Sequence, residues 1–157
     1  MKALVVAVLA LGCLCGPVTA ADSVIGNFLV KHERDPFGDA DTYVAILTKD
    51  GNMFAIRCLS GELSVAFTLQ SKADEGDVVE LKRRVDNDPV EDALGGVIAT
   101  ARNSVIVQTA NEAFVRRLGR AKTVAFRGTV NSIFATSTFE MRGADRVVAG
   151  ALRACKL

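Results

Sequence analysis

Few side chains in this sequence are candidates for catalysis or metal binding. His32 is the single histidine of the chain and stands between Lys31 and Glu33 near the end of a strand-like run. Nucleophilic catalysis by serine or cysteine needs a histidine base within hydrogen-bonding reach, and a carboxylate that orients this base. The residues around His32 do not form the glycine-flanked turn in which such a nucleophile is exposed. We therefore interpret His32 as an exposed histidine at the end of a strand.

Five aspartates gather in two loops and are the candidates for metal binding or hydrolysis. Calcium takes six or more oxygen ligands, but neither loop has the glycine turn and distal glutamate of an EF-hand. A carboxylate pair could also hydrolyse glycosides, yet the chain has no tryptophan and one tyrosine to stack on a sugar. We favour turn capping, and keep calcium binding and a hydrolase as alternatives. The aspartates are Asp35, Asp39, Asp41, Asp86 and Asp88.

The sequence contains neither of the common phosphate-binding motifs. Neither a G-x-x-x-x-G-K loop nor a G-x-G-x-x-G turn after a strand occurs. Two sets of basic residues, at 82–84 and at 116, 117 and 120, are typical of the solvated face of a strand and of a helix. Binding of a phosphate or of an acidic partner is the alternative. We predict no catalytic residue, no metal and no cofactor.

The first twenty residues predict an export signal. Lys2 precedes a short apolar run, and Val18, Thr19 and Ala20 are small enough for signal peptidase to cleave before Ala21. The apolar run is shorter than the roughly 20 residues of a membrane-spanning helix. An uncleaved anchor or lipidation at Cys13 are the alternatives. We expect a cleaved signal peptide at residues 1–20, and one β-rich domain at residues 21–157.

The charge of the exported chain excludes one class of partner. Removal of Lys2 leaves 18 basic and 18 acidic residues, so the net charge is about zero. Binders of nucleic acid or of anionic membranes usually carry an excess of positive charge. We predict no nucleic-acid partner and no membrane span after cleavage, and the sequence predicts no oligomeric state.

Two cysteines, Cys58 and Cys155, remain after cleavage. In an exported protein a pair of cysteines is most simply a disulfide, because the periplasm and the medium are oxidising. Two buried free thiols are the alternative. The disulfide would tie the middle of the chain to its end, and it predicts a periplasmic or secreted location.

Most of the chain alternates apolar and polar residues, as strands with one buried face do. The strongest signal is a meander over residues 42–70, in which Asp50 and Gly51 mark a tight hairpin turn. Gly26 interrupts a first strand over residues 23–33 and is typical of a bulge or of a close packing point. Between residues 90 and 102 we expect only a short strand, around residues 97–99.

Helical spacing appears twice. Asn111 is a good N-cap for a short amphipathic helix that ends at Gly119. Apolar residues at helical spacing, together with Cys155, predict a last helix that begins at Gly143. We therefore expect an α+β fold, mainly β: an antiparallel sandwich or curved sheet, with a short helix and a C-terminal helix linked by the disulfide.

Several motifs resemble the VasI/TagO group of small exported proteins associated with type VI secretion. They are D-P-F-G-D at residues 35–39, F-A-I-R-C at residues 54–58, R-V-D at residues 84–86, and T-F-E-M-R-G at residues 138–143 before a helix that ends in A-C. The resemblance implies no catalytic residue. The positions that match the pattern are Arg57, Cys58, Arg84, Asp86 and Cys155.

Arg57 points away from the face that holds Cys58, and we hypothesise that it forms a structural ion pair with Asp86. For function we expect an exported, non-catalytic binding or accessory module, whose partner is an envelope protein or a cell-wall component. The alternative is a secreted inhibitor of a wall-active or proteolytic enzyme, which would present an ordered, exposed loop at residues 34–41 or 86–96.

Overall fold

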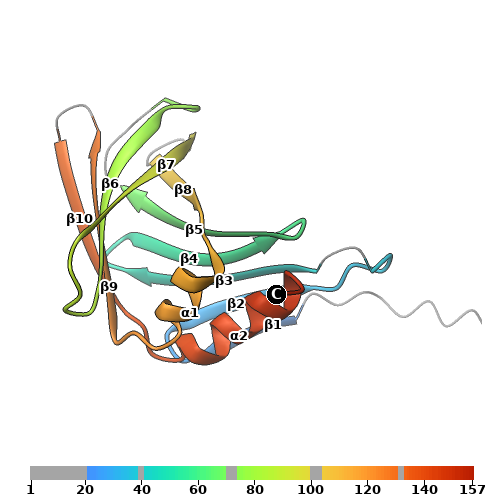
Figure 1. Cartoon of the computed structure of the whole chain (residues 1–157). Helices are drawn as coiled ribbons and strands as arrows, with labels where there is room; N and C mark the ends of the chain where they lie inside the picture. Colours follow the sequence, from blue (N-terminus) through green and yellow to red (C-terminus); the bar gives the residue numbers. More distant parts are fainter. Residues whose placement is uncertain (1–20, 39–40, 70–73, 100–103, 131–132) are drawn as a thin grey trace, which may run out of the picture.

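The computed structural model describes residues 21–38, 41–69, 74–99, 104–130 and 133–157 (Figure 1). The predicted signal peptide at residues 1–20 lies outside the described residues. The strands are β1 (Ala21–Ile25), β2 (Phe28–Glu33), β3 (Thr42–Lys49), β4 (Asn52–Leu59), β5 (Glu62–Leu69), β6 (Val78–Val85), β7 (Glu91–Ala99), β8 (Ser104–Thr109), β9 (Thr123–Val130) and β10 (Ile133–Glu140), and the helices are α1 (Glu112–Leu118) and α2 (Ala144–Ala154).

The expected fold class is wrong. All ten strands belong to one open antiparallel sheet, in the order β1-β2-β3-β4-β5-β8-β7-β6-β9-β10. The two helices have only 7 and 11 residues, so the chain is mainly β rather than α+β. A sandwich would need two sheets, but β5 pairs with β8 and β6 pairs with β9, and these two pairings make the sheet continuous.

The sheet is twisted, and side chains from strands near both ends of the strand order lie in one core. The ring of Phe126 on β9 stacks on Phe67 of β5 and on Phe54 of β4, with centroids 4.5 Å and 5.3 Å apart. Phe139 on β10 lies 5.7 Å from Phe54. All four rings are buried. Strands at opposite ends of the sheet order therefore bury their inner faces against each other.

Two glycine turns illustrate what local sequence can and cannot predict. The turn at Asp50 and Gly51 is confirmed, and both residues have positive φ. Gly26 was expected to form a bulge or a close packing point. It forms no bulge but turns the chain between β1 and β2, where Ile25 pairs with Phe28. The close packing is confirmed. A Cβ atom at Gly26 would collide with the carbonyl group of Arg142. This turn requires glycine because its backbone packs directly against the backbone that follows β10.

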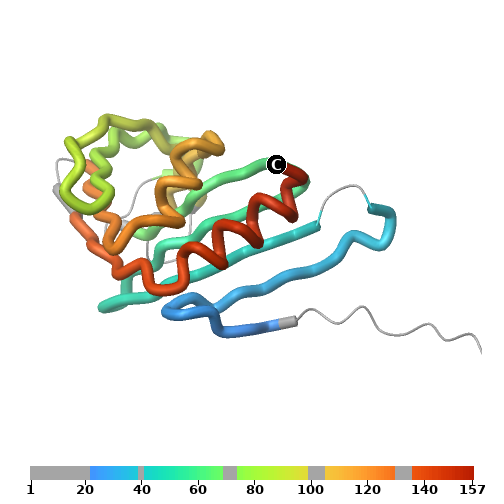
Figure 2. Tube along the Cα trace, turned by 60° about the horizontal axis from the view of Figure 1, so that its bottom comes forward, coloured from blue at the N-terminus to red at the C-terminus, as the bar shows by residue number. Residues whose placement is uncertain are grey.

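Both predicted helices are present. Asn111 caps α1, since its side-chain oxygen accepts a hydrogen bond of 2.8 Å from the backbone N–H of Phe114. Helix α2 lies along the inner side of the sheet and packs against β3, β4 and α1 (Figure 2). Its buried side brings the chain end to the middle of the sheet, and its buried residues are Ala144, Val147, Val148, Ala151, Leu152 and Ala154.

Candidate functional site

The loop between β2 and β3 is the clearest candidate for a binding site. We call residues 34–41 the Phe37 loop, of which residues 39 and 40 lie outside the described residues. The loop begins with a tight turn: the N–H of Phe37 donates to the Asp35 carboxylate (2.9 Å), and the N–H of Gly38 donates to the Asp35 carbonyl (3.1 Å). Gly38 has a φ of 78°, which favours glycine.

Phe37 stands at the tip of this turn with 89% of its surface exposed. By contrast, six other phenylalanines are buried: Phe28, Phe54, Phe67, Phe114, Phe126 and Phe139. The described part of the loop that follows β2, residues 34–38, projects beyond the end of the sheet in Figure 1. Exposure of a whole aromatic ring is unfavourable in water, and at interfaces aromatic residues are the ones that most often carry the binding energy.

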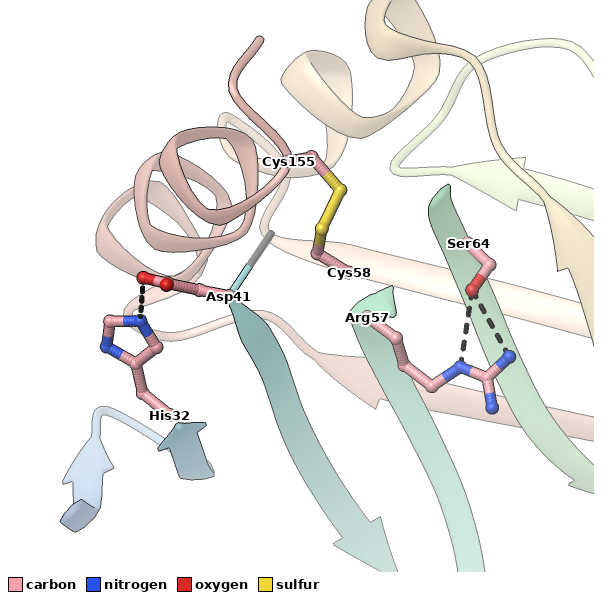
Figure 3. Close-up of a disulfide and its surroundings, with 6 residues drawn as sticks. All are labelled: His32, Asp41, Arg57, Cys58, Ser64 and Cys155. Carbon is pink, nitrogen blue, oxygen red and sulfur yellow. Dashed lines mark hydrogen bonds and ion pairs between the residues drawn. A yellow bond between two sulfur atoms is a disulfide. The ribbon is translucent and has the colours of Figure 1, made fainter. Parts of the chain in front are cut away.

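The base of the loop is closed by Asp41. One carboxylate oxygen accepts a hydrogen bond from the backbone N–H of Asp35 (3.1 Å), and the other lies 2.9 Å from Nε2 of His32 (Figure 3). The hydrogen bond with His32 lowers the pKa of Asp41, and the N–H of Asp35 adds to this effect. Asp41 therefore remains ionised to more acidic pH than an ordinary aspartate.

His32 and Asp41 thus form a pair that the sequence interpretation missed. A hairpin of β2 and β3 would have indicated this pair, because its register places His32 opposite Tyr43, two residues after Asp41. The His32 ring meets the Tyr43 ring edge-on, with centroids 5.7 Å apart. Burial raises the pKa of Tyr43, and its hydroxyl has no hydrogen-bond partner among the described residues. These contacts orient the loop.

The end of the chain holds the loop from the other side. The predicted disulfide is confirmed: Cys58 on β4 is bonded to Cys155 at the end of α2, with Cα atoms 5.6 Å apart (Figure 3). The next residue, Lys156, donates a hydrogen bond of 2.6 Å from Nζ to the carbonyl of Gly38. The disulfide therefore positions the residue that supports the tip of the loop.

The hypothesised ion pair between Arg57 and Asp86 is not formed. Arg57 donates two hydrogen bonds to Oγ of Ser64, at 3.3 Å and 3.2 Å, and burial lowers its pKa. β5, β8 and β7 separate its strand from β6, which Asp86 follows. The strand order cannot be read from the sequence, and the hypothesis of an ion pair was wrong for this reason.

Asp86 instead joins the end of β6 to the start of β9. Its Oδ1 accepts hydrogen bonds from the backbone N–H groups of Thr123 (2.7 Å) and Lys122 (2.9 Å). The backbone bond from Thr123 is the main reason that the pKa of Asp86 is lowered. Arg84 is exposed on β6, in register with Ala125 of β9.

A second polar cluster was missed. Glu91 accepts hydrogen bonds from Arg117 (2.6 Å) and Arg83 (2.9 Å), and the guanidinium of Arg83 lies 3.7 Å from the ring centre of Phe114. The bond from Arg117 is the main cause of the lowered pKa of Glu91. Arg83 lies on the same face of β6 as Leu81 and Val85. The alternation of apolar and polar residues along this strand therefore indicated that the Arg83 side chain faces inward.

The aspartates that hydrolysis or calcium binding would use lie in separate turns. Asp35 is in the Phe37 loop, whereas Asp86 and Asp88 follow β6, and Asp39 lies outside the described residues. Within the described part of the chain, no three metal-ligating side chains come together. The described aspartates of the two loops have separate local partners, since Asp41 binds the N–H of Asp35 and Asp86 binds the N–H groups of Lys122 and Thr123.

Comparisons with known proteins show only a fold. No family model and no curated protein matches the chain, so the resemblance to the VasI/TagO group has no support from them. The crystal structure of invasion associated protein B from Bartonella henselae superposes with a TM-score of 0.59 at 11% identity, and the match covers 88% of this chain and 100% of that one. The two chains share a fold.

Proposed function

We propose that this protein is an exported, non-catalytic binding module of the cell envelope, which uses the Phe37 loop to bind a protein partner. One observation carries the proposal: a whole phenylalanine ring is exposed on a loop held by hydrogen bonds at its base and its tip. An ordered loop loses little conformational entropy on binding, so its exposed aromatic ring can contribute most of its burial energy to affinity.

An oxidising compartment fits this proposal. A disulfide is compatible with the periplasm or the medium, where such bonds persist. The apolar run at residues 3–14, with small residues before Ala21, supports export. No helix among the described residues is long and apolar enough to span a membrane. A setting in type VI secretion rests only on the resemblance of residues 54–58 and 138–143 and would need its own evidence.

The alternative is a secreted inhibitor of a wall-active or proteolytic enzyme. The same loop favours it, because an ordered, projecting loop can enter a cleft without reorganisation. The binding module and the inhibitor differ in what the partner does once bound. Loss of the partner's enzymatic activity on mixing would assign the inhibitor.

The first test is a cross-linked pull-down of the mature protein from its own cell envelope, read by mass spectrometry. We expect Phe37→Ala to reduce recovery of the main partner at least about tenfold, as hot-spot truncations do. The matched control is Leu94→Ala on β7, which removes another exposed apolar side chain. Equal recovery with wild type and Phe37→Ala, or equal loss with both variants, would contradict the role of the loop.

A further inference from the structure

Three cations lie together on the exposed face of β6 and β9. Lys82 and Arg84 are exposed on β6, and Lys82 is directly opposite Arg127 of β9, the neighbouring strand (Figure 1). Side chains directly opposite each other have Cβ atoms about 5 Å apart, and diagonal neighbours such as Arg84 and Arg127 about 7–8 Å. We call Lys82, Arg84 and Arg127 the cation cluster. Their long side chains can therefore reach one common ligand.

The protein itself neutralises this cluster only in part. Lys82 forms a salt bridge of 2.7 Å with Asp92, but the Asp92 side chain is 82% exposed, and surface pairs of this kind are weak. Arg127 donates a hydrogen bond of 3.0 Å from Nε to the uncharged hydroxyl of Thr136. The ion pairs among the described residues include neither Arg84 nor Arg127. Because like charges on facing strands destabilise a sheet, stability does not explain this arrangement.

The cation cluster borders a hollow of about 220 Å³. All three members of the cluster line it, whereas no Asp or Glu among the described residues does. Arg83 lines it as well, but Glu91 accepts a hydrogen bond of 2.9 Å from Arg83 and balances its charge. Residues 82–84 therefore do more than form a solvated strand face. They contribute to a recess whose positive charge is not balanced.

A larger hollow of about 530 Å³ adjoins the first, since Lys82 and Arg127 line both. The rest of its lining has a different character: Leu81 contributes apolar surface, and Glu80 and Asp92 contribute carboxylates. These carboxylates disfavour an anion in the larger hollow, and they can accept hydrogen bonds from hydroxyl groups. The two hollows therefore suit a molecule with an anionic group at one end and an uncharged organic part at the other.

We infer that the cation cluster binds the phosphate group of a phosphomonoester, and that the organic part of the ester lies in the larger hollow. A phosphomonoester has three terminal oxygens and a charge of about −2 at neutral pH, so each cation of the cluster can bind an oxygen of its own. A carboxylate offers only two oxygens and a single charge. The inference goes beyond the proposed function, because the cation cluster and the Phe37 loop are different surfaces.

The test follows the amide shifts of the isotope-labelled mature protein by NMR at about 0.15 M ionic strength, where weaker surface interactions are screened. Phenyl phosphate and inorganic phosphate are the probes, and benzoate is the carboxylate control. We expect phenyl phosphate to produce saturable shifts at residues 82–84 and 125–127. It should bind more tightly than inorganic phosphate, because its ring buries apolar surface. Benzoate should bind at least about tenfold more weakly, since it has one oxygen and one charge fewer.

Matched variants separate the position of the charges from net charge. Arg84→Gln/Arg127→Gln should weaken binding of phenyl phosphate at least about tenfold, because it removes two charged donors. Lys49→Gln/Arg120→Gln removes two exposed positive charges elsewhere and should leave affinity within about twofold. Equal weakening by the two double variants, no saturation by about 10 mM phenyl phosphate, or equally tight binding of benzoate would overturn the inference.

A vesicle experiment distinguishes the source of the phosphate. Phosphatidylcholine vesicles that contain phosphatidic acid present the same phosphomonoester as a lipid headgroup, and co-sedimentation measures binding. Vesicle binding that is lost in Arg84→Gln/Arg127→Gln would assign a lipid ester, whereas binding of phenyl phosphate alone would assign a soluble one. Binding to the vesicles without binding of phenyl phosphate would overturn the inference. Phe37→Ala should leave phenyl phosphate binding unchanged, so failure of this test is distinct from failure of the proposed function.

Discussion

At the scale of single residues, Asp41 shows how one carboxylate can order a loop. One of its oxygens closes the base of the Phe37 loop through the N–H of Asp35, and the other is held by His32. An exposed aromatic side chain is useful for binding only if its backbone is positioned. The contribution of Asp41 to the proposed function is therefore to position the loop.

This role predicts an acid transition of the loop. Because the folded pKa of Asp41 is lowered, the contribution of its ionised form is complete above the ordinary aspartate value of about 3.9. It is lost as the pH falls through the lowered folded value. We expect the amide proton shift of Asp35, followed by NMR, to titrate with a midpoint below about 3.9, and this step to vanish in Asp41→Asn.

The neighbouring amide supplies the control. The N–H of Phe37 is bonded to the Asp35 carboxylate and not to Asp41, so its chemical shift at neutral pH should change little in Asp41→Asn. If the Asp35 amide kept its wild-type titration in this variant, Asp41 would not be the group that closes the loop.

At the scale of elements, α2 joins the core, the disulfide and the loop. Val147, Val148 and Leu152 bury its inner side, Cys155 fixes its end to β4, and Lys156 reaches the Phe37 loop. The disulfide closes a long loop, since its two cysteines are 97 residues apart in sequence. Its removal should affect both global stability and the local order of residues 34–38.

We expect Cys58→Ser/Cys155→Ser to lower the free energy of unfolding by up to about 4.5 kcal/mol, the chain-entropy value for a loop of this length. Urea denaturation followed by circular dichroism measures the change. Lys156→Ala is the matched control, because it removes only the contact with Gly38 and should cost about 1 kcal/mol or less. A double-serine variant as stable as wild type would show that the helix is held by packing alone.

At the scale of the whole molecule, strand order decides which residues meet. Three strands separate Arg57 from the strand that precedes Asp86, although both residues belong to the pattern singled out in the sequence. Each makes its own local hydrogen bonds, Arg57 with Ser64 and Asp86 with Lys122 and Thr123. The two residues should therefore contribute to stability independently.

A double-mutant cycle tests this independence. Asp86→Ala should lower the free energy of unfolding by about 2 kcal/mol, because it leaves two backbone N–H groups without a charged acceptor. The effects of Asp86→Ala and Arg57→Ala should add within about 0.5 kcal/mol, as they do for distant sites. A larger coupling energy in urea denaturation would mean that the two side chains interact after all.

The distribution of charge is also a property of the whole molecule. Composition predicts a neutral exported chain, and this argued against nucleic acid and anionic membranes as general partners. The fold places basic residues on the exposed side of α2, while many carboxylates lie in the turns of the sheet. A net charge close to zero therefore does not mean that charge is spread evenly over the surface.

The sequence by itself determined the features that depend on neighbouring residues. Asn111 capped its helix as expected, Asp50 and Gly51 made the expected turn, and the apolar spacing of Val147 to Leu152 predicted α2. Caps, turns and one-sided burial arise from contacts within a few residues, so their signals are visible in a short window. The disulfide was predictable because the sequence predicts that residues 1–20 are removed, which leaves only Cys58 and Cys155.

Only the tertiary structure decided the single open sheet, the hairpin turn at Gly26, the separation of Arg57 from Asp86 and the support of Phe37 by Lys156. These features depend on pairings between strands far apart in sequence. Several strand orders bury the same alternating apolar residues, so the pattern along the chain does not distinguish among them. Contacts such as the Phe126 stack on Phe67 select one order, and they exist only once the whole sheet has formed.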